Sequence, residues 1–120
     1  MRAFAVGLAA VALLAGCGGG GGGTQPAGSI QVQMTEFKFD PANITAPHGK
    51  VTFWLVNSGS QAHDLVIRDS SGNRLGASEL VSAGDSKAFT VNDIAAGTYT
   101  IFCDQQGHEA NGMKGSLTVT

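Results

Sequence analysis

Apolar and polar residues alternate over much of the chain from residue 30 onwards, which is the pattern of half-buried β-strands. Ile30, Val32 and Met34 are separated by polar residues and therefore share one face of a predicted strand. Residues 51–56 form a dense run of β-branched, aromatic and aliphatic residues, which is typical of a central strand. No stretch shows apolar residues at helical spacing over three turns. The predicted strands are residues 30–35, 37–39, 44–46, 51–56, 65–67, 88–91, 98–103 and 116–119.

Turn-forming residues separate these strands and favour a small all-β architecture. Pro47-His48-Gly49 forms a turn before the central strand. Residues 68–87, rich in glycine, serine and charged residues, are predicted to be a long connection with at most one helical turn around residues 78–81. Tyr99 follows a glycine in the way of the tyrosine corner of Greek-key sandwiches, whose hydroxyl anchors a neighbouring loop. Seven to eight short strands with such turns between them indicate a β-sandwich or a small barrel.

The N-terminal residues have the pattern of an export signal followed by a linker. Arg2 supplies one positive charge, and residues 3–15 contain no polar side chain. Leu14-Ala15-Gly16-Cys17 resembles the lipobox of bacterial lipoproteins, in which the cysteine is acylated; an ordinary signal peptide with a cysteine nearby by chance is the alternative. We expect a lipoprotein signal peptide at residues 1–16, a lipidated Cys17 with a glycine-rich tether over residues 17–28, and one domain over residues 29–120.

Composition excludes several functional classes. Charged residues make up 13% of the 120 residues, and seven basic against nine acidic residues give a net charge of −2. Without a basic stripe, nucleic-acid binding is not expected. The two cysteines suggest a disulfide in an exported protein. The lipobox takes Cys17, however, and the cluster described next needs Cys103 as a thiolate, so we expect no disulfide.

Cysteine, histidine and methionine residues gather around one predicted loop near the C-terminal end of the chain. Cys103 closes a predicted strand, Met113 precedes the last strand, and His108 lies between them. A loop of this length can bring the three side chains to one point, with His63 reaching it from a neighbouring strand end. Two imidazoles, a thiolate and a thioether match the donor set of blue copper electron-transfer sites, in which the methionine is a weak axial ligand.

The same segment resembles the C-terminal signature of the cupredoxins. The matching stretches are residues 98–103, Gly107-His108 and residues 112–115, and the Cys-x₄-His-x₄-Met spacing is most similar to the auracyanin type. The order of residues from Glu36-Phe37 to His63-Asp64 also follows the cupredoxin pattern, so the resemblance covers about residues 30–120.

This resemblance implies a cupredoxin-like Greek-key β-sandwich of seven to eight strands that holds one mononuclear type 1 copper. It implies equatorial ligands from His63, Cys103 and His108, an axial ligand from Met113, and His108 as the route by which the electron enters and leaves. An axial oxygen from Gln105, Gln106 or Glu109 is the alternative to Met113, and His48 is expected on the solvated surface.

Two residues depart from the best-known cupredoxins. Asp64 stands where an asparagine often ties the two ligand loops together, and Asp104 stands where threonine or serine often follows the ligand cysteine. Two ionised carboxylates that face the copper would favour Cu(II) and lower the reduction potential.

The expected function is the transfer of single electrons between redox proteins of the bacterial cell envelope. The protein is expected to be a monomer on the extracytoplasmic side, held to the membrane by its lipid anchor. Its partners, an electron donor and an electron acceptor, are expected to dock near His108. A copper-binding or storage protein without electron transfer is the alternative, because the same ligands would serve it.

Enzymatic activity is not expected. Multicopper oxidases and copper nitrite reductases need further copper sites with His-x-His pairs, and the chain has three histidines and no such pair. A binuclear copper centre needs two cysteines in the ligand loop, which contains only Cys103. A cysteine hydrolase that uses Cys103 and His63 would lack an obvious oxyanion arrangement and would leave His108 and Met113 without a role.

Overall fold

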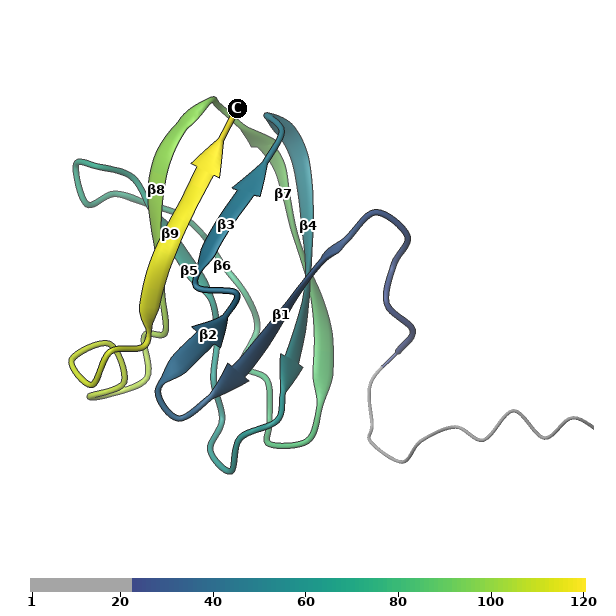
Figure 1. Ribbon diagram of the computed structural model, residues 1–120, viewed down its shortest axis with the longest axis vertical. Helices are drawn as coiled ribbons and strands as arrows, with labels where there is room; N and C mark the ends of the chain where they lie inside the picture. Colours follow the sequence, from purple (N-terminus) through teal and green to yellow (C-terminus); the bar gives the residue numbers. More distant parts are fainter. Residues whose placement is uncertain (1–22) are drawn as a thin grey trace, which may run out of the picture.

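The structure, a computed structural model, describes residues 23–120. In this range the chain forms nine β-strands and no helix, and the strands make two sheets that face each other (Figure 1). The predicted all-β sandwich is confirmed, with nine strands in place of seven to eight. The predicted signal peptide at residues 1–16 and the predicted lipidation site Cys17 lie outside the described residues. The strands are β1 (Ile30–Thr35), β2 (Lys38–Asp40), β3 (Asn43–Ala46), β4 (Gly49–Asn57), β5 (Val66–Arg68), β6 (Arg74–Ala77), β7 (Ser86–Ile94), β8 (Gly97–Phe102) and β9 (Lys114–Val119).

Both sheets are mixed. One has the strand order β2-β1-β4-β7 and the other the order β3-β9-β8-β5-β6. The pairs β1–β4 and β3–β9 are parallel, and the other neighbours are antiparallel. As a result, the segments that follow β1, β4 and β8 meet at one end of the sandwich, the lower end in Figure 1. No helix within residues 23–120 has the length and hydropathy to cross a membrane.

Alternate residues of the strands fill the space between the sheets, as the period of two requires. Phe53 and Leu55 of β4 are fully buried. Tyr99, Ile101 and Cys103, which alternation predicts on one face, belong to the same hydrophobic core. The Cys103 thiol therefore lies in apolar surroundings at the edge of the core, directly after β8.

The connection predicted over residues 68–87 is wrong in one part. Residues 74–77 form β6, which pairs with β5, and no helical turn occurs around residues 78–81. The physical reason is that β6 is an edge strand: Leu75 is 45% exposed, so burial imposes no alternation that the sequence would display. Val81, instead of lying in a helical turn, forms an isolated bridge with His63.

The predicted tyrosine corner is present at the opposite end of the sandwich. The hydroxyl of Tyr99 donates a hydrogen bond to the carbonyl oxygen of Ala95, at 2.6 Å. This bond fixes the connection between β7 and β8, so that β8 leads from the corner straight to Cys103.

Candidate metal centre

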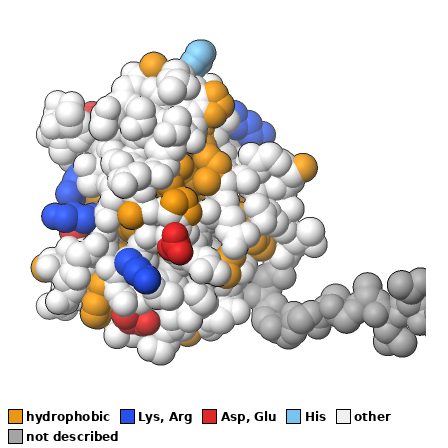
Figure 2. Space-filling view, viewed as in Figure 1, with side chains coloured by type: hydrophobic (Ala, Val, Ile, Leu, Met, Phe, Trp, Pro, Cys, Tyr) orange, Lys and Arg blue, Asp and Glu red, His pale blue; other side chains and the backbone are white. Residues whose placement is uncertain are grey.

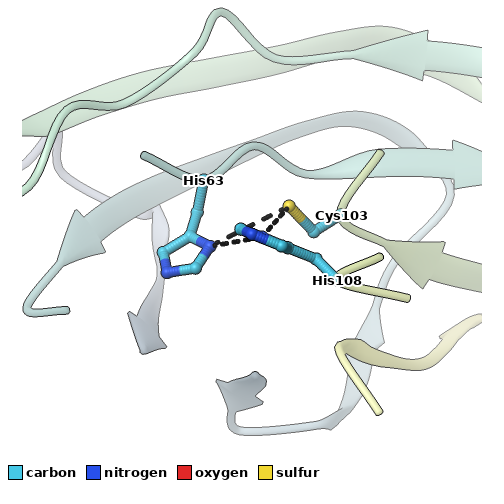
Figure 3. Close-up of side chains that lie close together, drawn as sticks. All are labelled: His63, Cys103 and His108. Atoms are coloured by element: carbon cyan, nitrogen blue, oxygen red, sulfur yellow. Dashed lines mark hydrogen bonds between the residues drawn. The ribbon is translucent and has the colours of Figure 1, made fainter. Parts of the chain in front are cut away.

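Three of the four predicted ligands meet where the loops after β4 and β8 come together. Nδ1 of His63 lies 3.2 Å from Nδ1 of His108, and Sγ of Cys103 lies 3.5 Å from Nδ1 of His108 and 3.9 Å from Nδ1 of His63. Figure 3 shows the two imidazoles and the sulfur directed toward one another. All three side chains are buried, and their donor atoms lie within 4.8 Å of one another.

The loop after β4 positions His63. The backbone N–H of His63 donates to the carbonyl of Val81 at 3.1 Å, and the N–H of Val81 donates back at 2.8 Å. Asn57, at the end of β4, is buried, and its side-chain amide donates to the carbonyls of Gln61 and Val81 at 2.7 and 2.9 Å. The N–H of Gly59 donates to Oδ1 of Asn57 at 2.9 Å. These bonds satisfy the buried amide and hold the loop in one shape.

Backbone hydrogen bonds tie the other three predicted ligands to one another in the loop between β8 and β9. Cys103 N–H donates to the carbonyl of Met113 at 3.1 Å, and Met113 N–H donates to the carbonyl of His108 at 3.0 Å. Gly107 and Gly112 have φ angles of 80° and 108°, a region that residues with a side chain rarely adopt. Met113 is fully buried, so the predicted axial ligand lies inward in the same loop as Cys103 and His108.

Burial sets the protonation of the donor atoms. It raises the pKa of the Cys103 thiol to about 11. It also lowers the pKa of His63, and the neighbouring charge of His108 lowers it further. At neutral pH the metal-free site therefore holds a protonated thiol and a neutral His63 imidazole. A cation that binds must displace the thiol proton and meets an imidazole that needs no deprotonation.

The donor set fits one transition-metal ion. Nitrogen and sulfur donors at about 2.0 and 2.3 Å from a common centre in a plane lie about 3.5–3.8 Å apart. The three observed separations, 3.2, 3.5 and 3.9 Å, lie around these values. Thiolate and thioether sulfur favour copper, and imidazole accommodates both of its oxidation states. The residues present therefore fit a single copper ion held by His63, Cys103 and His108, with Met113 as the predicted axial ligand.

Comparison with known proteins agrees with this site. The family model for the cupredoxin-like domain matches residues 5–119. The chain belongs to this family. Auracyanin-B of Chloroflexus aurantiacus is 44% identical over 48 residues, which are 40% of this chain and 20% of that protein, so the match spans about a fifth of the relative's length. The structure of reduced auracyanin from Roseiflexus castenholzii has a TM-score of 0.68 and 25% identity, covering 77% of this chain and 96% of that one. A structure of auracyanin B has a TM-score of 0.71 and 24% identity, covering 82% and 92%.

Asp64 ties the two ligand loops of this cupredoxin-like domain together. Its Oδ1 accepts a hydrogen bond from the backbone N–H of Asp104 at 2.9 Å. Burial, and next a side-chain hydrogen bond with the carboxyl of Asp104, raise the pKa of Asp64 to about 6, whereas the bond from the backbone N–H lowers it. The side-chain hydrogen bond lowers the pKa of Asp104, as does Arg74, whose Nη1 lies 3.1 Å from Oδ2. The carboxylate in place of asparagine thus keeps the link between the loops.

Two further residues, Glu36 and Gln61, contact the outer edges of the imidazoles. Oε1 of Glu36 lies 3.4 Å from Nε2 of His63, and Oε1 of Gln61 lies 3.0 Å from Nε2 of His108. Backbone N–H donors, led by that of Gln61, lower the pKa of Glu36 to about 2. Sequence reasoning missed both as site residues: Glu36 was visible only as part of the cupredoxin-like stretch, and no signal marks Gln61.

Charged residues of the second sheet hold the ligand loop from outside. Arg68 of β5 forms a two-pronged ion pair with Glu109, and Arg74 of β6 pairs with Asp104. Both guanidinium groups also lie over the ring of Phe102, at 4.3 and 5.4 Å from its centroid. The loop that carries His108 and Met113 is therefore fastened to β5 and β6 as well as to its own backbone.

Proposed function

We propose that this protein is a mononuclear blue copper protein that carries single electrons between redox partners. The observation that carries the proposal is the buried triangle of His63, Cys103 and His108. Membership of the cupredoxin-like family and similarity to the auracyanins support it. Bound copper would supply a one-electron couple between Cu(II) and Cu(I).

The contribution of the chain is a set of donors that are already in place. Backbone hydrogen bonds fix Cys103, His108 and Met113 relative to one another, and the bridge to Val81 fixes His63. The close-packed sandwich behind them resists displacement. Donors that move little when the charge of the site changes keep the reorganisation energy small, which favours fast electron transfer.

A titration with Cu(II), followed in the visible spectrum, tests the copper site. We expect an intense blue thiolate-to-copper band that Cys103→Ala abolishes. His48→Ala is the matched control, because His48 is an exposed histidine that contacts the carbonyl of Thr120 at 2.8 Å rather than the cluster, and it should leave the band unchanged. A weak, pale-blue spectrum, or a band that survives Cys103→Ala, would contradict the assignment.

Voltammetry separates electron transfer from storage. A carrier cycles reversibly between its two oxidation states, whereas a storage protein with the same ligands need not. Irreversible or absent current from a protein with the blue band would favour storage.

The same chain provides no His-x-His pair for a further copper site, so we propose no enzymatic activity for it.

The redox partners are proposed to dock near His108, because this residue is 7% exposed while His63 and Cys103 are at 0%. On the face in Figure 2, acidic and basic side chains are few and interspersed. Ala110→Glu, an exposed position in the same loop, should slow oxidation by the anion ferricyanide at low salt. Ala95→Glu, at the opposite end of the sandwich, is the control, and equal rates for both variants would contradict docking near His108.

We also propose that the protein is a lipoprotein on the extracytoplasmic side of a bacterial membrane. The support is the sequence Leu14-Ala15-Gly16-Cys17 after an apolar run. Mass spectrometry of the protein purified from membranes should show acyl chains on Cys17, and Cys17→Ala should release it from the membrane fraction. An unmodified Cys17 in a membrane-free fraction would refute the anchor.

A further inference from the structure

The outer nitrogen of each predicted histidine ligand faces a side chain from a single small network. Nε2 of His63 is buried and has no hydrogen bond of good geometry, yet it lies 3.4 Å from Oε1 of Glu36. Nε2 of His108 lies 3.0 Å from Oε1 of Gln61. The two residues are linked, because the backbone N–H of Gln61 donates to Oε1 of Glu36 at 2.6 Å.

Each contact favours one form of a neutral imidazole, which carries its proton on either Nδ1 or Nε2. An ionised carboxylate only accepts hydrogen bonds, so the position beside Glu36 favours a proton on Nε2 of His63. The amide oxygen of Gln61 likewise accepts from Nε2 of His108. In both rings this leaves Nδ1 with a lone pair, and the two Nδ1 atoms lie 3.2 Å apart beside the sulfur of Cys103.

The backbone is shaped for this approach of Glu36. The N–H groups of Ser60 and Gln61 both donate to Oε1, at 2.7 and 2.6 Å. A Cβ atom at Gly59 would lie 2.7 Å from both carboxylate oxygens, so only glycine leaves room for the carboxylate here. The side chain of Glu36 is held at 23% exposure beside a ring at 0%, which places a charge directly behind His63.

We propose that Glu36 and Gln61 are positioning residues that hold both histidines in the Nε2–H form, so that both Nδ1 lone pairs face the metal position. The charge of Glu36, next to a ligand, additionally favours the more positive oxidation state of the bound metal. This inference rests on the proposed copper site. It adds the two residues that fix the protonated nitrogen of each imidazole in the metal-free protein.

The first test needs no metal. Long-range ¹H–¹⁵N NMR of the metal-free protein at pH 8 should show both His63 and His108 in the Nε2–H form. Gln61→Ala should give His108 a mixture of the two forms while leaving His63 unchanged. Predominant Nδ1–H in the unmodified protein at either histidine would overturn the proposal, whatever the copper titration shows.

The second test separates the charge of Glu36 from its shape. Glu36→Gln keeps an acceptor oxygen for Ser60 and Gln61 but removes the charge, and we expect about a 10-fold loss of Cu(II) affinity and a raised reduction potential. Gly59→Ala displaces the carboxylate without substituting Glu36 itself, and it should likewise lower the Cu(II) affinity and raise the reduction potential. Because that clash involves only the end of a flexible side chain, the fold should persist even if Glu36→Gln does not fold.

Asp93→Asn is the matched control for the change in charge. Asp93 is exposed on β7 next to Ile94, which pairs with Gly49, whereas the site lies at the other end of that strand pair, where Val56 pairs with Ser86. The Cu(II) affinity and the reduction potential of the Asp93→Asn variant should equal those of the unmodified protein. If Glu36→Gln and Gly59→Ala bind Cu(II) as tightly and at the same potential as Asp93→Asn, Glu36 has no positioning role. Absence of the blue band from the unmodified protein would instead refute the copper assignment.

Discussion

Asp64→Asn should make the metal-free protein more stable at alkaline pH and leave its stability nearly unchanged at acid pH. Asp64 is 6% exposed, and burial, followed by its side-chain hydrogen bond with the carboxyl of Asp104, raises its pKa from 3.8 to about 6. Asparagine has almost the same shape as the protonated acid. Its side-chain oxygen can still accept from the N–H of Asp104, which is the contact that ties the ligand loops together.

The sign follows from linkage. A carboxyl whose pKa is higher in the folded state stabilises the fold fully below the unfolded pKa, and this contribution is lost as pH rises through the folded pKa. A rise from 3.8 to about 6 corresponds to about 3 kcal/mol, at 1.36 kcal/mol per pKa unit. The pKa of Asp104 is lowered in the folded state, so its ionisation stabilises the fold as the pH rises and offsets part of the loss caused by Asp64. We therefore expect a net effect of about 1–2 kcal/mol, which develops between about pH 4 and pH 7.

Urea unfolding of the metal-free protein at a series of pH values measures this effect. The difference in unfolding free energy between Asp64→Asn and the unmodified protein should be near its minimum at pH 4 and larger by about 1–2 kcal/mol at pH 8. Asp93→Asn, which removes the same charge at an exposed site, should show no such increase. A difference that stays constant with pH, or that shrinks as pH rises, would refute the argument that burial raises the pKa of Asp64 in the folded protein.

Three other substitutions probe the fold and the site. Gly115→Ala should lower the free energy of unfolding in urea by about 4 kcal/mol or more, or abolish cooperative unfolding, because its Cβ would lie 2.0 Å from the carbonyl oxygen of Ala42. A variant as stable as the unmodified protein would contradict this contact. Tyr99→Phe should lower the unfolding free energy in urea by about 1 kcal/mol, since it removes the hydrogen bond to Ala95, and no loss would mean that the corner is not needed. Met113→Leu should keep the blue band and raise the reduction potential in voltammetry, because a weak donor to Cu(II) is removed; an unchanged potential would exclude Met113 as an axial ligand.

The strand pattern was predictable where strands are buried and was not where they lie at an edge. Alternation in residues 30–34 and the apolar run of residues 51–56 report directly on burial, and both are strands in the structure. Residues 74–77 pair on one side only and expose Leu75, so no hydrophobic period marks them. The core face of Tyr99, Ile101 and Cys103 followed from period two alone.

The candidate site was predictable to the extent that its residues are close in sequence. Cys103, His108 and Met113 lie in one loop, so their spacing carries the information, and His63 was found through its order relative to them. The contacts of Glu36 and Gln61 depend on the parallel pairing of β1 with β4, which brings the segments after both strands to the same end of the sandwich. Nothing in the residue types predicts that pairing.

The sequence suggested that the charges of Asp64 and Asp104 act on the copper, and the structure adds a third acid, Glu36, next to a ligand. Asp104 is paired with Arg74, so its charge is largely balanced beyond the site. Asp64 has a pKa of about 6 and binds a backbone N–H, so its charge is lost as the pH falls below about 6. The pKa of Glu36 is about 2, and its carboxylate lies directly behind the ring of His63. Glu36 therefore combines direct contact with a ligand ring and a charge that persists through mildly acid pH, and of these three acids it should contribute most to the preference for the oxidised metal.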